Sequence, residues 1–531
     1  MTGTRGVTRI DDLTRRAAAD HPDRTALVTG AARLTFAELE AGVDRLAASL
    51  APHVEPGDRV AILAGNRAEY AEAYLGVPRA GARLVPLHPR LHPDEWARLL
   101  ERTRPAALLA EADLLARLDE RVRRALGVRL VVEWPPTAGD EPGPWPEPAP
   151  THPGALHAPA EPARRDPEDV AWMIPTSGTT GPARLAMLTH RSLLAAVTAT
   201  LAARGVGDDD VLATPFPLCH VAGYNLLVFW ARARPVVLLA GFDPGEILRV
   251  VTAEGVTTLS LAPTMLAALL DHLDRLGPTG RPGGPDRPLG PVRTITYGAS
   301  PIPPPLLRRA VTDLRVDLSQ GYGMTELSGN AVFLGPEAHR AAAAGDDRLA
   351  GAAGRPAPGV EVRIVDDDGR DVPTGATGEI VVRAPQVMAG YWDDPDAGAA
   401  ALDGGWLHTG DVGYLDDHGD LHVVDRRKDV IVTGGENVAS REVEDVLATH
   451  PAVAEVAVVG LPDPRWGERV SAVVVVRPGH PPPTLAELDA HVRARLAPFK
   501  VPRALFLVDA LPRNHAGKVA KRALRERFGN Q

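Results

Sequence analysis

Cysteine is nearly absent from this chain, which has one such residue, Cys219, in 531. A single thiol excludes an internal disulfide framework and a cysteine-rich zinc cluster. The sequence also lacks an apolar run of the roughly 20 residues that a membrane-spanning helix needs. Residues 1–18 mix Arg, Asp and Thr without an apolar centre, so neither export nor lipid anchoring is signalled. We therefore expect a cytoplasmic protein without a membrane span.

A basic stripe is missing as well. The net charge is -10 with both signs interspersed, which argues against a nucleic-acid partner. Hydrophobic residues make up 44% of the chain and charged residues 24%, as is typical of globular proteins. Because 531 residues are too many for one ordinary core, we expect a large body with subdomains and at least one smaller unit.

Helix and strand patterns alternate along the N-terminal part of the chain. Thr35 and Glu38 form a T-x-x-E capping box ahead of apolar residues at helical spacing, which predicts that a helix begins there. Short apolar stretches at 59–63 and 82–87 are bounded by Gly or Pro and predict strands. This alternation is typical of an α/β body. Segment 134–167, rich in Pro and Ala, is expected to be an exposed loop.

The C-terminal part has the pattern of a small α+β unit. Helices are predicted at 443–447 and 485–496, and strands at 456–460 and 470–476. A second capping box, Thr484 with Glu487, begins the later helix. The charged run 425–429 lies just before this unit and is the expected place of an interdomain hinge.

The strongest local motif is a segment of hydroxyl residues and glycines after the apolar stretch 170–174. Its residues are Thr176, Ser177, Gly178, Thr179, Thr180 and Gly181. Glycine lets the backbone close around an anion, while amides and hydroxyls donate hydrogen bonds, so the segment predicts a phosphate-binding loop. It is not a Walker A loop, which would need a Gly-Lys-Ser/Thr sequence. A solvent-exposed turn is the alternative interpretation of this hexamer alone.

A second motif follows the apolar stretch 314–318. It comprises Gln320, Gly321, Tyr322, Gly323, Met324, Thr325 and Glu326. A flat tyrosine beside glycines can stack on a base, threonine can bind phosphate, and glutamate supplies the hard oxygen ligand that Mg²⁺ prefers. Taken alone, the motif is equally compatible with a tight turn.

In their order and spacing, these segments resemble the adenylate-forming superfamily of acyl-CoA synthetases, peptide-synthetase adenylation domains and luciferases. The resemblance covers nearly the whole chain and is greatest to bacterial fatty or aryl acid–CoA ligases. Further matching motifs lie at 354–356, 378–392, 408–411, 425–429, 434–438 and 512–518. The resemblance implies an α/β fold: a large N-terminal domain, 1–425, binds ATP and acid, and a small mobile α+β domain, 426–531, rotates about a hinge near Lys428.

The resemblance also implies roles for individual residues. Asp411 and Arg426 match the pair that holds the ribose hydroxyls, and Tyr322 matches the aromatic that stacks on the base. Thr325 and Glu326 match the α-phosphate and magnesium contacts. The remaining matches beside the nucleotide are Gly298, Ala299, Ser300, Gln320, Gly321 and Gly323.

The resemblance implies that Lys518 is the catalytic residue of adenylation, where a compact cation offsets the negative charge of the transition state. Rotation in the second step should withdraw Lys518 and bring a thiol-tunnel loop forward. That loop consists of Gly434, Gly435, Glu436 and Asn437. His220 matches the histidine that gates the acyl site, with a histidine that only packs as the alternative. ATP and coenzyme A are the implied co-substrates, with Mg²⁺ as cofactor.

The chain departs from the family pattern after the phosphate loop. The usual x-Pro-Lys-Gly is replaced by Pro182, Ala183, Arg184 and Leu185. Arg184 keeps a positive charge near the pyrophosphate, but its fork differs from the point charge of lysine, and Leu185 removes a flexible glycine. We still expect adenylation, with altered closure of the loop. A catalytically weak nucleotide- or acyl-binding protein is the alternative from another class.

These features predict an AMP-forming acid–thiol ligase that activates a small carboxylic acid as its acyl-AMP and transfers the acyl group to coenzyme A. Segments 224–230, 297–301 and 321–323 are expected to line the acid pocket. They contain no carboxylate that would pair with an α-ammonium group, so a fatty or aryl acid is favoured over an amino acid. The alternative acceptors are a phosphopantetheine carrier protein, an amine or another nucleophile.

Overall fold

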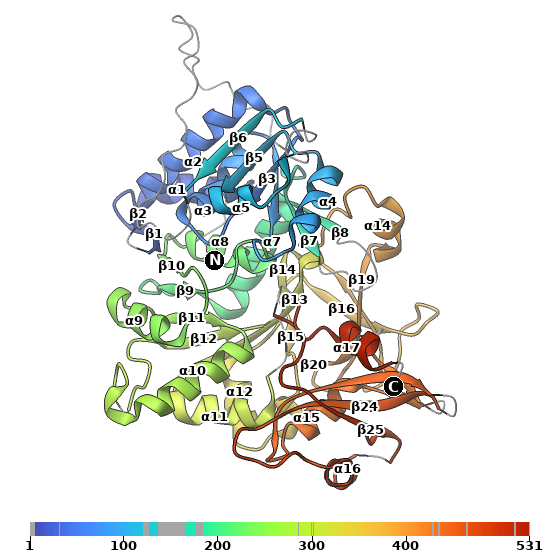
Figure 1. Cartoon of the computed structure of the whole chain (residues 1–531). Coiled ribbons are helices and arrows are strands. Elements are labelled where there is room, and N and C mark those ends of the chain that lie inside the picture. Colours follow the sequence, from blue (N-terminus) through green and yellow to red (C-terminus); the bar gives the residue numbers. More distant parts are fainter. Residues whose placement is uncertain are drawn as a thin grey trace, which may run out of the picture.

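The structure is a computed structural model (Figure 1). It describes residues 6–30, 32–120, 127–135, 166–176, 184–284, 286–298, 300, 302–426, 429–433, 436–463, 466–496, 498–514 and 517–529.

Two large sheets form the body of the N-terminal part. The first has the strand order β6-β5-β3-β4-β7-β8, in which only the β7–β8 pair is antiparallel. Its strands are β3 (Arg59–Leu63), β4 (Arg83–Leu87), β5 (Ala107–Glu111), β6 (Leu130–Trp134), β7 (Val170–Thr176) and β8 (Arg184–Thr189). The helices that alternate with them are α3 (Ala68–Arg79), α4 (Pro93–Thr103), α5 (Ala112–Ala116) and α7 (His190–Arg204). The central strands are almost wholly buried, as expected for parallel strands covered on both faces.

The second sheet has the order β15-β14-β13-β12-β11-β9-β10-β1-β2. Its strands are β1 (Thr25–Thr29), β2 (Ala32–Thr35), β9 (Leu212–Thr214), β10 (Val236–Leu238), β11 (Thr258–Leu261), β12 (Thr294–Tyr297), β13 (Asp317–Met324), β14 (Gly329–Leu334) and β15 (Arg355–Pro356). Its region contains α1 (Asp12–Asp20), α2 (Phe36–Leu50), α8 (Tyr224–Trp230), α9 (Pro244–Glu254), α10 (Pro263–Leu276), α11 (Pro304–Leu314), α12 (Pro336–Ala343) and α13 (Asp347–Ala350). Strands β11, β12 and β13 are parallel, so their carboxyl ends meet at one edge.

A smaller antiparallel sheet completes this part. It contains β16 (Glu361–Val365), β17 (Gly378–Arg383), β18 (Leu402–Asp403), β19 (Trp406–Leu415) and β20 (Leu421–Arg426), with α14 (Pro395–Ala401) beside it. Strand β20 is the last element before the predicted hinge.

The C-terminal domain is separate and has its own sheet (Figure 1, orange to red). Its strands are β21 (Ile431–Thr433), β22 (Glu436–Val438), β23 (Val453–Asp463), β24 (Gly467–Val476) and β25 (Ala504–Leu507), and its helices are α15 (Ser440–Leu447), α16 (Leu485–Arg493) and α17 (Lys521–Phe528). Among the described residues, the two apolar clusters of this domain contain no residue before Ile431. The predicted fold class, a large α/β domain with a separate small α+β domain, is therefore confirmed.

Both predicted capping boxes are present. In each, the threonine Oγ1 accepts a bond from the glutamate N–H at 3.2 Å, and the glutamate accepts from the threonine N–H in return. The tight turn that was the alternative interpretation of the second motif is not found, because residues 320–324 are the end of strand β13. Of the predicted exposed loop, residues 136–165 lie outside the described part of the chain.

Candidate functional site

Glycines allow three backbones to meet at the carboxyl end of β13. A Cβ atom on Gly298, which follows β12, would lie 2.9 Å from the carbonyl oxygen of Gly321. A Cβ on Gly321 would lie 2.2 Å from Asn330 Nδ2, and one on Gly323 would lie 2.0 Å from the carbonyl oxygen of Gly329. Real Cβ atoms do not come this close, so the second motif needs its glycines for strand packing as well as for any ligand.

Tyr322 and Asp411 meet although they lie in different sheets. The Tyr322 phenol donates to Asp411 Oδ2 at 2.8 Å. Asp411 is buried on β19, where its N–H donates to Thr409 Oγ1 at 3.1 Å. Its backbone pairs in register with Arg426 of β20, whose side chain lies outside the description. The structure thus brings the predicted stacking aromatic to the predicted ribose-binding carboxylate.

Glu326 accepts hydrogen bonds at both its backbone carbonyl oxygen and its side-chain carboxylate. It lies in the short 3₁₀ helix Thr325–Leu327, and its carbonyl oxygen accepts from the Met388 N–H at 2.9 Å. The Tyr391 phenol donates to Glu326 Oε1 at 2.8 Å. Burial, and then the Glu326 carboxylate, raise the pKa of Tyr391, so this phenol stays a neutral donor. The carboxylate keeps further oxygen lone pairs, which fits a hard cation such as Mg²⁺.

The segment that carries Tyr391 joins the edge of strand β8. The Met187 N–H donates to the Gly390 carbonyl at 2.9 Å, the Ala389 N–H donates to the Met187 carbonyl at 2.9 Å, and the Trp392 N–H donates to the Leu185 carbonyl at 2.8 Å. This pairing ties the small sheet to the strand that follows the predicted phosphate loop.

Arg184, the residue in place of the family lysine, lies against this segment. Its guanidinium carbon is 5.4 Å from the centroid of the Tyr391 ring, and its Nε is 3.3 Å from Asp394 Oδ2. Its carbonyl oxygen accepts from Thr176 Oγ1 at 3.3 Å. Sequence reasoning assigned no role to Tyr391 or Asp394, although the Gly-Tyr-Trp signal at 390–392 was among the matching motifs.

His220 lies immediately before the 3₁₀ helix Val221–Gly223 and is half-buried. Its ring centroid is 5.2 Å from that of His88. The adjacent Cys219 is buried, and burial raises the pKa of its thiol. A neutral buried thiol is a poor nucleophile, so Cys219 has no nucleophilic role in the site.

Gln320 faces a buried network. Its Oε1 lies 3.0 Å from the Tyr297 hydroxyl, which also lies 2.8 Å from His339 Nε2. The Tyr297 hydroxyl donates to Gln320 Oε1, and His339 Nδ1 donates to the Gly335 carbonyl oxygen at 2.8 Å. Burial lowers the pKa of His339 to about 4. The Gln320 side chain therefore supports the sheet next to the predicted nucleotide site.

Lys518 lies in a tight hairpin of the C-terminal domain and is exposed. The Asn514 N–H donates to the Lys518 carbonyl at 2.8 Å, and the Lys518 N–H donates to Asn514 Oδ1 at 3.0 Å. These bonds fix the backbone that presents the lysine.

A buried polar network joins the end of β20 to the C-terminal domain. The Ser440 N–H donates to Asp425 Oδ2 at 2.7 Å, and Lys521 Nζ donates to Ser440 Oγ at 2.5 Å. Lys521 also lies 2.8 Å from Glu444. Burial opposes the charge of Lys521, but Glu444 and Asp425 together raise its pKa. Any rotation about a hinge between Asp425 and Ser440 has to rearrange these contacts.

Several predicted site residues cannot be placed. Those outside the described residues are Ser177, Gly178, Thr179, Thr180, Gly181, Ala299, Lys428, Gly434 and Gly435. Only the backbone of Glu436 and Asn437 is described, as part of β22. Ser300 is exposed after the end of β12. Their predicted roles stay predictions.

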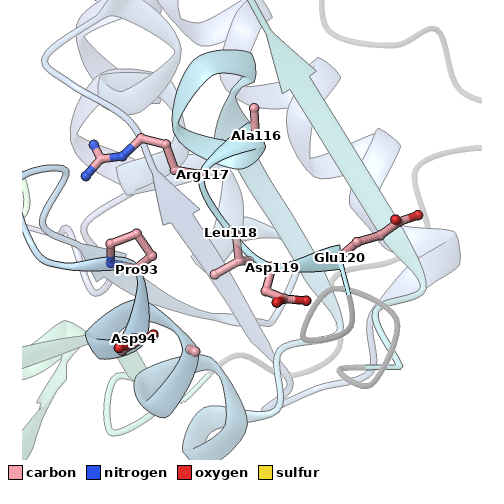
Figure 2. Close-up of a pocket in the computed structure, with 8 residues that line it drawn as sticks. Pro93, Asp94, Ala116, Arg117, Leu118, Asp119 and Glu120 are labelled. Atoms are coloured by element: carbon pink, nitrogen blue, oxygen red, sulfur yellow. The ribbon is translucent and has the colours of Figure 1, made fainter.

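A surface depression of about 530 Å³ lies elsewhere, between α4 and α5 (Figure 2). Arg117 extends away from the carboxylates of Asp119 and Glu120, and its guanidinium lies 4.7 Å from the centroid of the Trp96 ring. This depression contains none of the predicted site residues.

Within the described residues, no helix combines the length and apolar character needed to cross a membrane.

Comparison with family models gives two matches. Residues 14–392 match the model described as AMP-binding enzyme, and residues 442–518 match the AMP-binding enzyme C-terminal domain. Together they cover both the N-terminal body and the separate C-terminal domain.

Three characterised relatives match nearly end to end. A 3-(7a-methyl-1,5-dioxo-octahydro-1H-inden-4-yl)propanoyl:CoA ligase of Mycobacterium tuberculosis is 40% identical, with 95% of this chain and 96% of that protein covered. A feruloyl-CoA synthase of an Amycolatopsis species is 38% identical (97% and 98% covered). A fatty acid–acyl-carrier-protein ligase of Streptomyces coeruleorubidus is 34% identical (96% and 95% covered).

Two solved structures have the same fold over the whole chain. The o-succinylbenzoate CoA synthetase of Bacillus subtilis, in complex with its acyl-adenylate intermediate, has a TM-score of 0.81 at 31% identity, with 97% of each chain covered. An amide bond synthetase of Marinactinospora thermotolerans has a TM-score of 0.83 at 34% identity, with 98% of this chain and 99% of that chain covered.

Proposed function

Because this chain belongs to the AMP-binding enzyme family, we propose that the residues gathered at the end of β13 bind ATP and a carboxylic acid in one site. The chain is an AMP-forming acid–thiol ligase, which activates its acid as the acyl-adenylate before transfer. The observation that carries the assignment of this site is the meeting of Tyr322 with Asp411 beside the Glu326–Tyr391 pair.

In the first step, a carboxylate oxygen of the acid attacks the α-phosphorus of ATP. The bond from this phosphorus to the bridging oxygen breaks, and pyrophosphate leaves with that electron pair. Asp411 accepts from a ribose hydroxyl, and the Tyr322 ring lies against the base. Mg²⁺, when bound at Glu326, offsets charge on the phosphate oxygens. Lys518 offsets the charge that accumulates between carboxylate and α-phosphate.

In the second step, the thiol sulfur attacks the acyl carbon. The bond to the adenylate oxygen breaks, AMP leaves, and the thiol proton passes to solvent. Coenzyme A is the proposed acceptor, and the Glu436–Val438 strand is proposed to face the thiol tunnel. Rotation near Lys428 exchanges this strand for Lys518, so that one site serves both steps.

The proposed acid is apolar and fatty or aryl. Helix α8, part of the segment expected to line the pocket, is buried along its whole length. The polar atoms of its first and last side chains have partners inside the protein. Tyr224 Oη lies 3.2 Å from Thr200 Oγ1, and Trp230 Nε1 donates to the Ala26 carbonyl at 3.0 Å. With these polar atoms paired inside the protein, the segment supplies no free polar group from Tyr224 or Trp230 for recognition of the acid. Relatives named for an indenyl propanoate and a ferulate support this class of acid.

The test is Mg²⁺-dependent ATP consumption by the purified chain with a panel of fatty, aryl and amino acids. Pyrophosphate, AMP and the acyl thioester are followed with and without coenzyme A. The expected result is turnover with fatty or aryl acids only when coenzyme A is present. Absence of pyrophosphate release with every acid would overturn the proposal.

A second acceptor class has specific support. One relative is named as a ligase for an acyl-carrier protein and one solved neighbour as an amide bond synthetase. Parallel reactions with a phosphopantetheinylated carrier protein and with an amine distinguish these cases. Adenylate formation that turns over with either of these, but not with coenzyme A, would replace the proposed acceptor.

A further inference from the structure

Two histidines and the single cysteine converge beside the 3₁₀ helix that follows His220. One ligand atom from each of His88, Cys219 and His220 lies within 4.8 Å of the other two. His88 and Cys219 are 4% and 3% exposed, whereas His220 is half-buried. His220 is therefore the most exposed residue of a cluster that is otherwise buried.

The backbone on both sides of the cluster is fixed. The Leu218 N–H donates to Asn66 Oδ1 at 2.9 Å, and the Tyr74 hydroxyl donates to the Leu218 carbonyl oxygen. On the other side, Trp96 Nε1 donates to the carbonyl oxygen of His88 at 2.9 Å. These bonds hold the two segments in place before any ligand arrives, which reduces the cost of binding.

A buried phenol next to the cluster lacks a protein partner. Tyr70 Oη is fully buried and has no hydrogen-bond partner among the described residues. Burial, and then the neighbouring Cys219, raise the pKa of Tyr70. A buried hydroxyl is usually satisfied by protein or by ordered water, so an additional polar occupant beside Cys219 would account for it.

We propose that His88, Cys219 and His220 form a binding site for one thiophilic divalent cation, of which Zn²⁺ is the natural example. One sulfur and two imidazole nitrogens are a ligand set that zinc takes in three-ligand sites, with a fourth position open to water. Tetrahedral coordination needs ligand atoms roughly 3.5 Å apart, given metal–ligand bonds of about 2.0–2.3 Å. The ligand atoms, which lie within 4.8 Å of one another, have to close to this spacing on binding.

Metal coordination would change the positions of two protons, one on Cys219 and one on His88. The Cys219 thiol loses its proton to solvent as the metal–sulfur bond forms. The Arg90 N–H donates to His88 Nδ1 at 3.0 Å, so the neutral ring carries its proton on Nε2. Binding through Nε2 moves this proton to Nδ1 and replaces the Arg90 bond by one to water. Arg90 is exposed, so its amide is open to water for this exchange.

Occupancy would fix His220 to His88 across the turn that precedes α8. This is separate from the magnesium requirement of the ligase, because Glu326 offers a hard oxygen and the cluster offers sulfur and nitrogen. The proposal does not depend on the identity of the acid or of the acceptor.

The test uses Co²⁺ as a spectroscopic probe on the full chain, after chelation and without a histidine tag. One equivalent of Co²⁺ is expected to give visible bands of a tetrahedral ion and a near-ultraviolet sulfur-to-cobalt charge-transfer band, and Zn²⁺ is expected to displace it. Cys219→Ser should abolish the charge-transfer band and weaken binding by roughly 100-fold or more. His418→Ala, at an exposed histidine outside the cluster, is the matched control and should change neither.

His88→Gln is the second variant and should weaken binding to a similar degree while the charge-transfer band of saturated protein persists. Circular dichroism of each variant checks its fold before titration. Absence of Co²⁺ binding, a spectrum without the charge-transfer band, or a band that survives Cys219→Ser in folded protein would each overturn the site.

Discussion

The Tyr391 side chain connects two charged groups that the sequence placed in separate motifs. Its hydroxyl binds the Glu326 carboxylate, and its ring faces the Arg184 guanidinium. Arg184 is also paired with Asp394. The arginine that replaces the usual lysine after the phosphate loop has a planar guanidinium that packs on an aromatic ring. The ammonium group of a lysine would pack on this ring less well.

Tyr391→Phe is expected to weaken magnesium binding rather than acid binding. The substitution keeps the ring under Arg184 but removes the donor that orients Glu326. Loss of such an outer contact should raise the Mg²⁺ concentration for half-maximal pyrophosphate release by roughly tenfold and leave the KM of the acid unchanged. Initial rates at varied Mg²⁺ measure this, with Tyr414→Phe as the control. Equal Mg²⁺ dependence in all three proteins would remove the positioning role.

His339 should make the stability of the chain fall on acidification. Its pKa is lowered by burial to about 4, whereas an unfolded histidine titrates near 6.5. Between these values the unfolded chain binds a proton that the folded chain does not, so the histidine costs no stability above pH 6.5 and an increasing amount below it. The loss should reach about 2 kcal/mol by pH 5.

The measurement is urea unfolding at pH 7 and pH 5 for the wild type and His339→Gln. The variant lacks the titrating ring, so its free energy of unfolding should fall less between the two pH values by about 2 kcal/mol. An identical fall in both proteins would show that other groups carry the pH dependence.

At the scale of elements, the sequence predicted those features that depend only on neighbouring residues, such as the first residues of a helix. The two threonine-glutamate boxes start α2 and α16 as expected, because a capping box depends only on neighbouring residues. A tight turn was the alternative interpretation of the second motif, yet residues 320–324 form strand. The glycines are explained only by the approach of β14, a partner that no local pattern reveals.

Substitutions on helix α17 can test the polar junction between β20 and the C-terminal domain. The side chains of Lys521 and Glu444 are 15% and 21% exposed, so Lys521→Ala leaves a largely buried carboxylate without its cation. We expect the C-terminal domain to lose about 3 kcal/mol of stability. Arg522→Ala on the same helix removes an exposed i,i+4 pair and should change stability by less than about 0.5 kcal/mol. Urea unfolding of both variants, read by limited proteolysis, makes the comparison; equal effects would contradict the buried pairing.

At the scale of the molecule, Lys518→Ala should separate the two half-reactions. Adenylate formation should slow by roughly 100-fold or more, since the cation is used at the α-phosphate. Thioester formation from supplied acyl-AMP should stay within a fewfold of wild type. Single-turnover assays of each step measure this. Equal losses in both steps would contradict the two-orientation cycle.

Collinear motifs were enough to predict the fold class and the family, because both are properties of the whole chain. The site was predicted one segment at a time. Tyr322 and Asp411 were each named, but their contact joins residues from different sheets and has no signature in spacing. Tyr391 and Asp394 were missed for the same reason: their importance comes from what packs against them.

The self-contained core of the C-terminal domain has a practical consequence. Its apolar clusters draw only on residues from Ile431 onward within the described chain, and polar groups form the Asp425–Ser440 junction. The chain is therefore a candidate for a split enzyme, cut near the predicted hinge and produced as two polypeptides. Such halves would have to find each other in solution, so activity would depend on their concentration instead of on the tether.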